Sequence, residues 1–141
     1  MHEICKEFGI DAGHRVTRHE SQCKNVHGHR YRILVHVRAP ELDAAGRVVD
    51  FGVVKERVGA WLLEHLDHGY VHHPDDDVAP LLRARGMKTY AMPAELGEPT
   101  AENLARLILA RAQELLGDQL RVHRVVVWET PTSSATAEAG W

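Results

Sequence analysis

The sequence predicts a single α+β domain, residues 1–141, whose elements follow the order ββααββ. Two stretches near the start alternate apolar and polar side chains, as strands do. Two central stretches repeat apolar residues at helical spacing, and a run of valines near the end predicts another buried strand. An antiparallel sheet with two helices on one face buries all of these apolar sides together.

The first two strands are expected at residues 3–16 and 27–39, joined by a polar loop. The apolar side chains of their shared buried face are Phe8, Ile10 and Ala12, then Tyr31, Ile33, Val35 and Val37. His14 continues this face in the first strand, and His27 and His29 begin it in the second, because alternate side chains of a strand point the same way. An antiparallel pairing therefore brings the three histidines together.

Two helices follow. Asp50 predicts the start of the first, because its carboxylate can accept a free N–H of the first turn, and we expect this helix to end between Leu66 and Gly69. Thr100 begins the second in the same way, and Gly117 ends it. The buried face of the second helix is formed by Leu104, Leu107, Ile108, Leu115 and Leu116.

The other segments give weaker signals. Residues 47–49 suggest a strand end, and residues 70–98 read mainly as a long loop, because they are rich in proline and glycine. Within that loop, the run Asp75–Asp77 is expected to cap a short helix that ends at Leu82. The valine-rich strand is expected at 119–130, and shorter strands are expected at 88–92 and 135–141.

Composition narrows the class of protein. The net charge of −3 and the lack of a long basic run argue against nucleic acid as the main partner. No apolar run approaches the roughly 20 residues that span a bilayer, and no signal peptide is recognisable, so the expected compartment is the cytoplasm. Two cysteines are too few for a disulfide framework and should be free thiols there.

A sheet of four strands would leave two open edges, which are prone to pair with other chains. We therefore expect an oligomer in which sheets join edge to edge into a closed barrel.

His14, His27 and His29 form a predicted zinc site. Three imidazoles are the usual protein ligands of a catalytic zinc ion, whose fourth position stays open for water or substrate. Such an ion is a Lewis acid that can polarise a hydroxyl or carbonyl. Two other interpretations stay open: the His-x-His pair is a chance pattern in a chain with 11 histidines, or Cys23 is a fourth ligand that closes a purely structural site.

Other residues carry candidate chemistry. Cys23 near a metal ion could act as a general base or nucleophile. Asp67 and His68 are either a solvated helix end or an orienting carboxylate with a proton carrier. Glu129 either reaches solvent or accepts two N–H groups of a heterocycle. Cys5 is expected to be a buried small residue. His65, His72 and His73 receive no role.

Taken together, the chain resembles the 6-pyruvoyltetrahydropterin synthase / 6-carboxytetrahydropterin synthase family over roughly residues 4–130. The motifs that carry the resemblance are Phe8–Arg15, Cys23-x-x-x-His27-Gly28-His29, Val49–Gly52, Leu66–His68, Pro99–Leu104 and Glu129–Thr130. Any one of these is weak, but six in the right order and spacing are specific.

The resemblance implies the tunnelling fold (T-fold), in which ββααββ subunits form trimeric barrels and two barrels stack into a hexamer. It implies Zn²⁺ on the three histidines and a proton-transfer group of Cys23, Asp67 and His68. Glu129, with help from Thr100, would anchor the pterin ring. Family active sites lie between subunits, so Cys23 and His68 need not come from one chain.

The implied substrate is 7,8-dihydroneopterin triphosphate. The short spacing from Cys23 to His27 favours the bacterial queuosine-pathway members, which form 6-carboxy-5,6,7,8-tetrahydropterin, acetaldehyde and triphosphate. Lys24 argues against a folate branch that carries a glutamate there. The alternatives are the 6-pyruvoyl product of the tetrahydrobiopterin route, another pterin or purine, and a non-catalytic structural-zinc module.

Two positions depart from the family pattern. After the Asp67–His68 pair the chain continues into a longer insertion that ends at Glu98, where the family usually has an asparagine soon afterwards. Ala101 stands where a serine is common. The insertion is expected to reshape the rim of the pocket.

Overall fold

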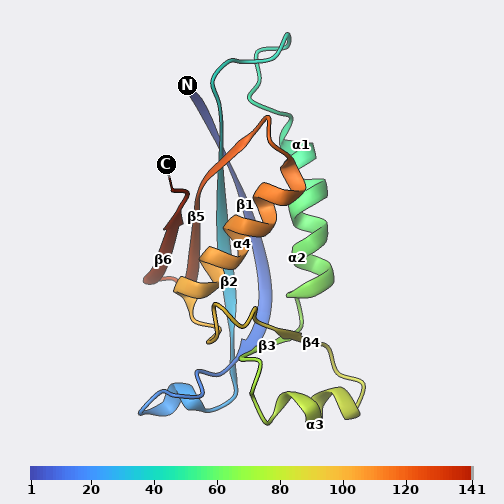
Figure 1. Ribbon diagram of the computed structural model, residues 1–141, viewed down its shortest axis with the longest axis vertical. Coiled ribbons are helices and arrows are strands. Elements are labelled where there is room, and N and C mark those ends of the chain that lie inside the picture. Colours follow the sequence, from blue (N-terminus) through green and yellow to red (C-terminus); the bar gives the residue numbers. More distant parts are fainter. Residues whose placement is uncertain (141) are drawn as a thin grey trace.

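Four long antiparallel strands form the centre of the fold in the computed structural model, which describes residues 1–140 (Figure 1). They are β1 (His2–His14), β2 (His27–Ala39), β5 (Arg121–Thr130) and β6 (Ser133–Glu138). The loop between β1 and β2 contains one short 3-10 turn, Gln22–Lys24. The predicted positions of β1, β2 and β5 are confirmed, and β6 begins two residues before the expected strand. Trp141, the last residue of that expected strand, lies outside the described residues.

Two helical segments lie on the same face of this sheet, as predicted (Figure 1). The first runs through α1 (Phe51–Val54), one π-helical stretch (Lys55–Gly59) and α2 (Ala60–His65). The second is α4 (Ala101–Leu116). Their core-facing side chains pack on the apolar face of β1, β2 and β5.

The caps of both helices follow the sequence. The Asp50 carboxylate accepts the Gly52 N–H at 2.7 Å, and the Thr100 hydroxyl accepts the Asn103 N–H at 3.2 Å. Gly117 ends α4 with φ of +84°, a backbone angle that glycine adopts without strain.

Two short strands extend the sheet beyond β1. They are β3 (Tyr70–His72) and β4 (Thr89–Ala91), which give the order β4-β3-β1-β2-β5-β6. Both pair in parallel, so the sheet is mixed rather than purely antiparallel. The strand expected at 88–92 is confirmed by β4. The strand β3 was not predicted, because three residues are too few to show a period of two.

The pairing of β1 with β2 is continuous from His2 opposite Ala39 to His14 opposite His27. This register places alternate residues of both strands in the core and brings the two histidines face to face at the end of the ladder. Beyond this end, β3 pairs with β1 only at Gly13 and His14.

The strand β5 carries two irregularities that decide which residues face the core. Val122 and Val125 are three residues apart and would face opposite sides of a regular strand, but both are buried, as is Val127. The register shift between His36 and Val37 of β2 absorbs the extra residue. A second shift, against β6, lies between Trp128 and Thr130, at Glu129.

Two predictions about local structure are wrong. Residues 47–49 form no strand, because Arg47 is held in a turn by the Asp43 carboxylate, which accepts the Arg47 N–H at 2.9 Å. The run Asp75–Asp77 does not cap α3 (Ala79–Ala84), which begins after Val78. Asp76 is buried instead and accepts the Arg15 Nε–H at 2.7 Å.

The prediction that Cys5 is buried is also wrong, because this residue is exposed. It lies on β1 one residue out of phase with the core series, on the sheet face away from the helices. Within residues 1–140, no helix is both long enough and apolar enough to cross a membrane.

Candidate metal centre and substrate site

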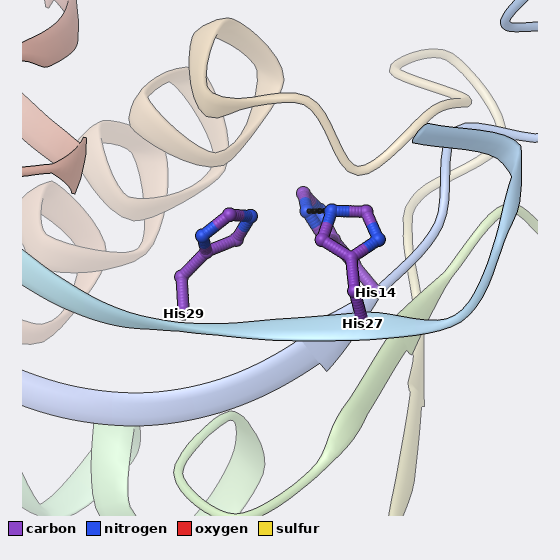
Figure 2. Close-up of side chains that lie close together, drawn as sticks. All are labelled: His14, His27 and His29. Carbon is purple, nitrogen blue, oxygen red and sulfur yellow. Dashed lines mark hydrogen bonds between the residues drawn. The ribbon is translucent and has the colours of Figure 1, made fainter. Parts of the chain in front are cut away.

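His14, His27 and His29 come together where the β1–β2 ladder ends (Figure 2). One ring nitrogen of each lies within 4.8 Å of the others. His14 is buried, and the other two are half-buried. The predicted three-histidine cluster therefore exists in a single chain.

Backbone carbonyls orient two of these rings. The Nδ1–H of His14 donates to the Pro99 carbonyl at 2.8 Å, and the Nδ1–H of His27 donates to the Asn25 carbonyl at 2.7 Å. Neutral imidazole carries one N–H, so both Nε2 atoms present lone pairs. These two Nε2 atoms face each other at 3.1 Å.

Two lone pairs at this distance repel each other unless a cation lies between them. Zinc takes imidazole nitrogen at about 2.0–2.1 Å, so two ligands of a tetrahedral ion lie about 3.3 Å apart. The third ring also offers a nitrogen to a metal ion, because the buried Nε2 of His29 has no hydrogen-bond partner among residues 1–140. The donor set and its orientation therefore fit a zinc ion.

The protonation of the cluster agrees with this assignment. Burial lowers the pKa of His14, against the opposing influence of the Pro99 carbonyl and Glu129. Burial also lowers the pKa of His29. Both rings are thereby kept neutral, and a neutral imidazole is the form that binds a metal ion.

Two further contacts of the cluster were not predicted from the sequence. The Tyr31 hydroxyl lies 3.3 Å from Nδ1 of His14, and the Pro99 carbonyl comes from the residue before the cap of α4. The position of Tyr31, two residues after His29 on the same strand face, was the available signal. The Pro99 contact joins segments 85 residues apart and depends on the tertiary fold.

Glu129 reaches the cluster from β5. Its carboxylate oxygens lie 4.0 Å from Nε2 of His14 and 3.8 Å from Nε2 of His29. The register shift at this residue lets the strand aim the carboxylate toward the histidines. The carboxylate remains 29% exposed and can accept N–H groups from a ligand.

A cavity of about 380 Å³ opens beside the histidines and contains most of the predicted site residues. Its lining includes His14, His27, Cys23, Thr100 and Glu129. Cys23 is half-buried in the short turn of the β1–β2 loop, where its carbonyl accepts the Val16 N–H at 2.8 Å.

Within residues 1–140, the mutually close metal-binding atoms belong to the three histidines and do not include the Cys23 sulfur. This arrangement favours a position of Cys23 beside a metal ion held by the histidines over a role of Cys23 as a fourth ligand.

Asp67 and His68 lie elsewhere. The Asp67 carboxylate accepts the Asp11 N–H at 2.9 Å and lies 2.9 Å from Nδ1 of His68. These hydrogen bonds lower the pKa of Asp67 although burial opposes the shift. His68 has a positive φ of 59°, is 76% exposed at its side chain, and lines a separate hollow with Gly28. One chain therefore does not bring His68 to Cys23.

His65, His72 and His73, which were given no role, also lie outside the cavity, whereas His19 is part of its lining. His65 packs against Trp61, with ring centroids 5.1 Å apart. His72 is buried in β3, where its ring stacks on Tyr70, and its Nδ1–H donates to the His73 carbonyl at 2.7 Å.

Comparison with known proteins connects this geometry to a family. The 6-pyruvoyl tetrahydropterin synthase family model matches residues 3–140. The 6-carboxy-5,6,7,8-tetrahydropterin synthase of Haemophilus influenzae is 31% identical over 140 residues, which covers 94% of this chain and 96% of that protein. The Aquifex aeolicus protein of the same name is 35% identical over 157 aligned positions, covering 94% and 95%.

Solved structures show the same fold. The protein WS1659 from Wolinella succinogenes matches with a TM-score of 0.75 at 24% identity, covering 99% of this chain and 98% of that one. The Caenorhabditis elegans 6-pyruvoyl tetrahydropterin synthase matches with a TM-score of 0.72 at 21% identity, covering 98% and 95%. With the family model matched across nearly the whole chain and relatives above 30% identity, this chain belongs to the 6-pyruvoyl tetrahydropterin synthase family.

Proposed function

We propose that this protein is a zinc-dependent lyase that converts 7,8-dihydroneopterin triphosphate to 6-carboxy-5,6,7,8-tetrahydropterin, acetaldehyde and triphosphate. The observation that carries the proposal is the convergence of three imidazoles on one point beside a cavity that also holds Cys23, Thr100 and Glu129. The names of the relatives at 31–35% identity favour the carboxy product.

His14, His27 and His29 would hold the zinc ion. When bound, the ion supplies a Lewis acid that polarises the side-chain hydroxyls of the substrate and makes an adjacent C–H more acidic. The buried Pro99 and exposed Asn25 carbonyl contacts keep His14 and His27 in the tautomer that presents Nε2 to the ion.

Glu129 is the proposed anchor for the pterin ring. An ionised carboxylate accepts two parallel N–H groups from the amidine-like edge of the heterocycle, which fixes the ring in one orientation. Thr100 assists at the start of α4, although its hydroxyl already accepts the Asn103 N–H.

Cys23 is the proposed proton-transfer group at the cavity wall. Asp67 and His68 are the proposed second proton-transfer pair, with Asp67 fixing the imidazole through Nδ1 and leaving Nε2 to exchange the proton. Since the two groups lie apart in one chain, a neighbouring subunit would bring His68 to Cys23.

The open edges of the sheet support such an assembly. Among residues 1–140, β1 has no strand partner on its outer side before Gly13, and β6 is a strand at the opposite edge. Two long unpaired edges favour closure with further copies. We propose a homo-oligomeric barrel, most simply a hexamer of two stacked trimers.

The test is a mass-spectrometric product assay on the zinc-loaded protein with 7,8-dihydroneopterin triphosphate. Acetaldehyde with 6-carboxytetrahydropterin is the expected result. Release of triphosphate with 6-pyruvoyltetrahydropterin alone would move the chain to the second candidate, the pyruvoyl synthase. Neither product from an intact zinc-bound oligomer would overturn the substrate assignment.

A Cys23→Ala variant separates the catalytic from the structural reading of this residue. We expect it to keep zinc and lose turnover by at least about 100-fold, since proton transfer by a positioned group typically contributes that much. Loss of zinc from this variant would instead make Cys23 a fourth ligand and the module a structural one. Zinc content by elemental analysis and product formation are measured on the same sample.

A further inference from the structure

A second group of reactive side chains lies on the sheet face opposite the helices. Cys5 and His36 are directly opposite each other in the β1–β2 ladder, and Glu3 lies two residues before Cys5 on the same face. The Cys5 sulfur is 3.7 Å from Nε2 of His36. The other nitrogen of that ring, Nδ1, is 3.2 Å from the Glu3 carboxylate.

This order of groups is the one that activates a cysteine nucleophile. A thiol next to one nitrogen of an imidazole, with a carboxylate on the other nitrogen, allows the ring to take the proton while the carboxylate holds its orientation. The sheet register fixes all three positions, because they come from paired strands rather than from loops.

The surroundings hold the ring in place and limit solvent around it. His36 is 9% exposed, whereas Cys5 is exposed and open to a reagent. Arg38 donates to the remaining Glu3 oxygen at 2.7 Å. The charged groups that face the thiol and the ring come from three strands and are Glu3, Glu7, Arg38 and Arg124.

The pKa of the Glu3 carboxyl is lowered, whereas the pKa of the Cys5 thiol is raised. Although burial opposes it, hydrogen bonds from Arg38 and His36 lower the pKa of Glu3, so this carboxylate stays ionised. Burial and the charges of Glu3 and Glu7 raise the pKa of the Cys5 thiol, against the influence of Arg124. The thiol therefore keeps its proton until a base removes it.

We propose that Cys5 is a thiol-modification site, activated by His36 and Glu3, that exchanges with small disulfides. In this step Cys5 Sγ attacks one sulfur of the disulfide as its proton moves to Nε2 of His36. One S–S bond forms and the original S–S bond breaks. Cys5 is oxidised to a mixed disulfide, and the departing thiolate takes the proton from His36 as the reduced product.

This site is independent of the cavity described above. The Cys5 side chain is on the opposite face of β1 from His14, and Cys5, His36 and Glu3 do not line that cavity. Failure of the lyase proposal would leave it unaffected.

The experiment treats the assembled full-length protein with 2-hydroxyethyl disulfide between pH 6 and 9. Peptide mass spectrometry then follows mixed-disulfide formation at Cys5 and Cys23 separately. Only the thiolate attacks, so the rate of an unassisted thiol rises about tenfold for each unit by which the pH increases, as long as the pH is below the pKa of the thiol. We expect Cys5 to show a flatter profile near neutral pH.

Two variants test the role of the ring. His36→Gln should slow exchange at Cys5 by at least about tenfold and restore the steep pH profile, since the general base is lost. Glu3→Gln should slow exchange by a smaller factor. His65→Gln changes a half-buried histidine elsewhere and should leave the rate unchanged.

Two results would overturn the proposal. One is an unchanged rate and pH profile at Cys5 in His36→Gln, and the other is the absence of a mixed disulfide at Cys5 in the assembled wild-type protein. Circular dichroism of each variant establishes that it is folded. If His36→Gln does not fold, Glu3→Gln decides, because an unchanged Cys5 rate in that variant also contradicts the proposal.

Discussion

The strands β1 and β2 present two faces that differ completely although they share one backbone. The face toward the helices is apolar along most of its length and ends in His14, His27 and His29. The opposite face carries cross-strand ion pairs, such as Arg32–Glu7 at 2.9 Å and Arg30–Asp11 at 3.3 Å. Alternate residues therefore meet a packed core on one side and solvent on the other.

The difference teaches what each face contributes. Apolar burial on the helix side supplies stability and also keeps histidines neutral at the end of the ladder. Ion pairs on the other side gain little, because water screens them. Under our two proposals, the same imidazole side chain would serve as a metal ligand on the first face and as a base for Cys5 on the second.

The largest expected effect is on the metal. Replacing His27 with alanine removes one of three ligands, so we expect loss of the zinc ion and a fall in turnover of at least about 100-fold. The matched control is His36→Ala, which removes an imidazole from the same strand on the other face and should keep zinc. Elemental analysis measures both variants. Full zinc occupancy in His27→Ala would refute the assignment of the site.

The next effect is on stability. Ile33 is 1% exposed, and Ile33→Ala should lower the free energy of unfolding by about 2–5 kcal/mol through lost burial and a cavity. Its neighbour Arg32 points to the polar face, and Arg32→Ala should change the free energy of unfolding far less. Denaturant unfolding at one fixed protein concentration compares them. Equal losses would mean that the two faces do not divide as described.

A smaller effect is expected at the ion pair between Arg15 and the buried Asp76. Burial raises the pKa of Asp76, but the Arg15 guanidinium, whose Nε–H donates to this carboxylate, lowers it, and the net shift is downward. Because the folded-state pKa lies below the unfolded value of about 3.9, this contribution is present above that pH and is lost as the pH falls through the folded value.

Asp76→Asn tests this sign. We expect a loss of about 1–3 kcal/mol in the free energy of unfolding at pH 7, from a buried partner left poorly paired. The difference from wild type should shrink as the pH falls below 4. Unfolding curves at several pH values provide the measurement, and Asp77→Asn, at an exposed position, is the control. A difference that grows toward acid pH would show that the sign is wrong.

The smallest effect is expected on the polar face. The hydrogen bond from Arg32 lowers the pKa of Glu7, but both side chains are about half exposed. We expect Glu7→Gln to leave the melting temperature and turnover unchanged within error. A clear drop in melting temperature would show that this face is covered by another subunit.

Much of the fold could be predicted because its signals are local. Alternation gave β1 and β2 their faces, and helical spacing with the caps Asp50, Thr100 and Gly117 gave both helices. The strand β3 could not be predicted, because it consists of three residues that pair with the distant end of β1. The prediction that Asp75–Asp77 caps a helix failed for a related reason, because Asp76 accepts a hydrogen bond from Arg15, which is distant in the sequence.

The sequence by itself determined the zinc-type histidine cluster. Two histidines on one strand face and a third on an adjacent strand must meet if the strands pair, and the pairing follows from matched alternation. The motif spacing also determined the family, which the comparisons confirm.

Only the tertiary structure decided how the histidines are oriented and what stands beside them. The Pro99 carbonyl, the bulge at Glu129 and the cavity bring together segments that are distant in the sequence; the contact between His14 and Pro99 alone joins residues 85 apart. It also exposed Cys5 opposite His36 and separated His68 from Cys23 within one chain. A local pattern can specify which face a side chain occupies, but its partners across the fold depend on packing between distant elements.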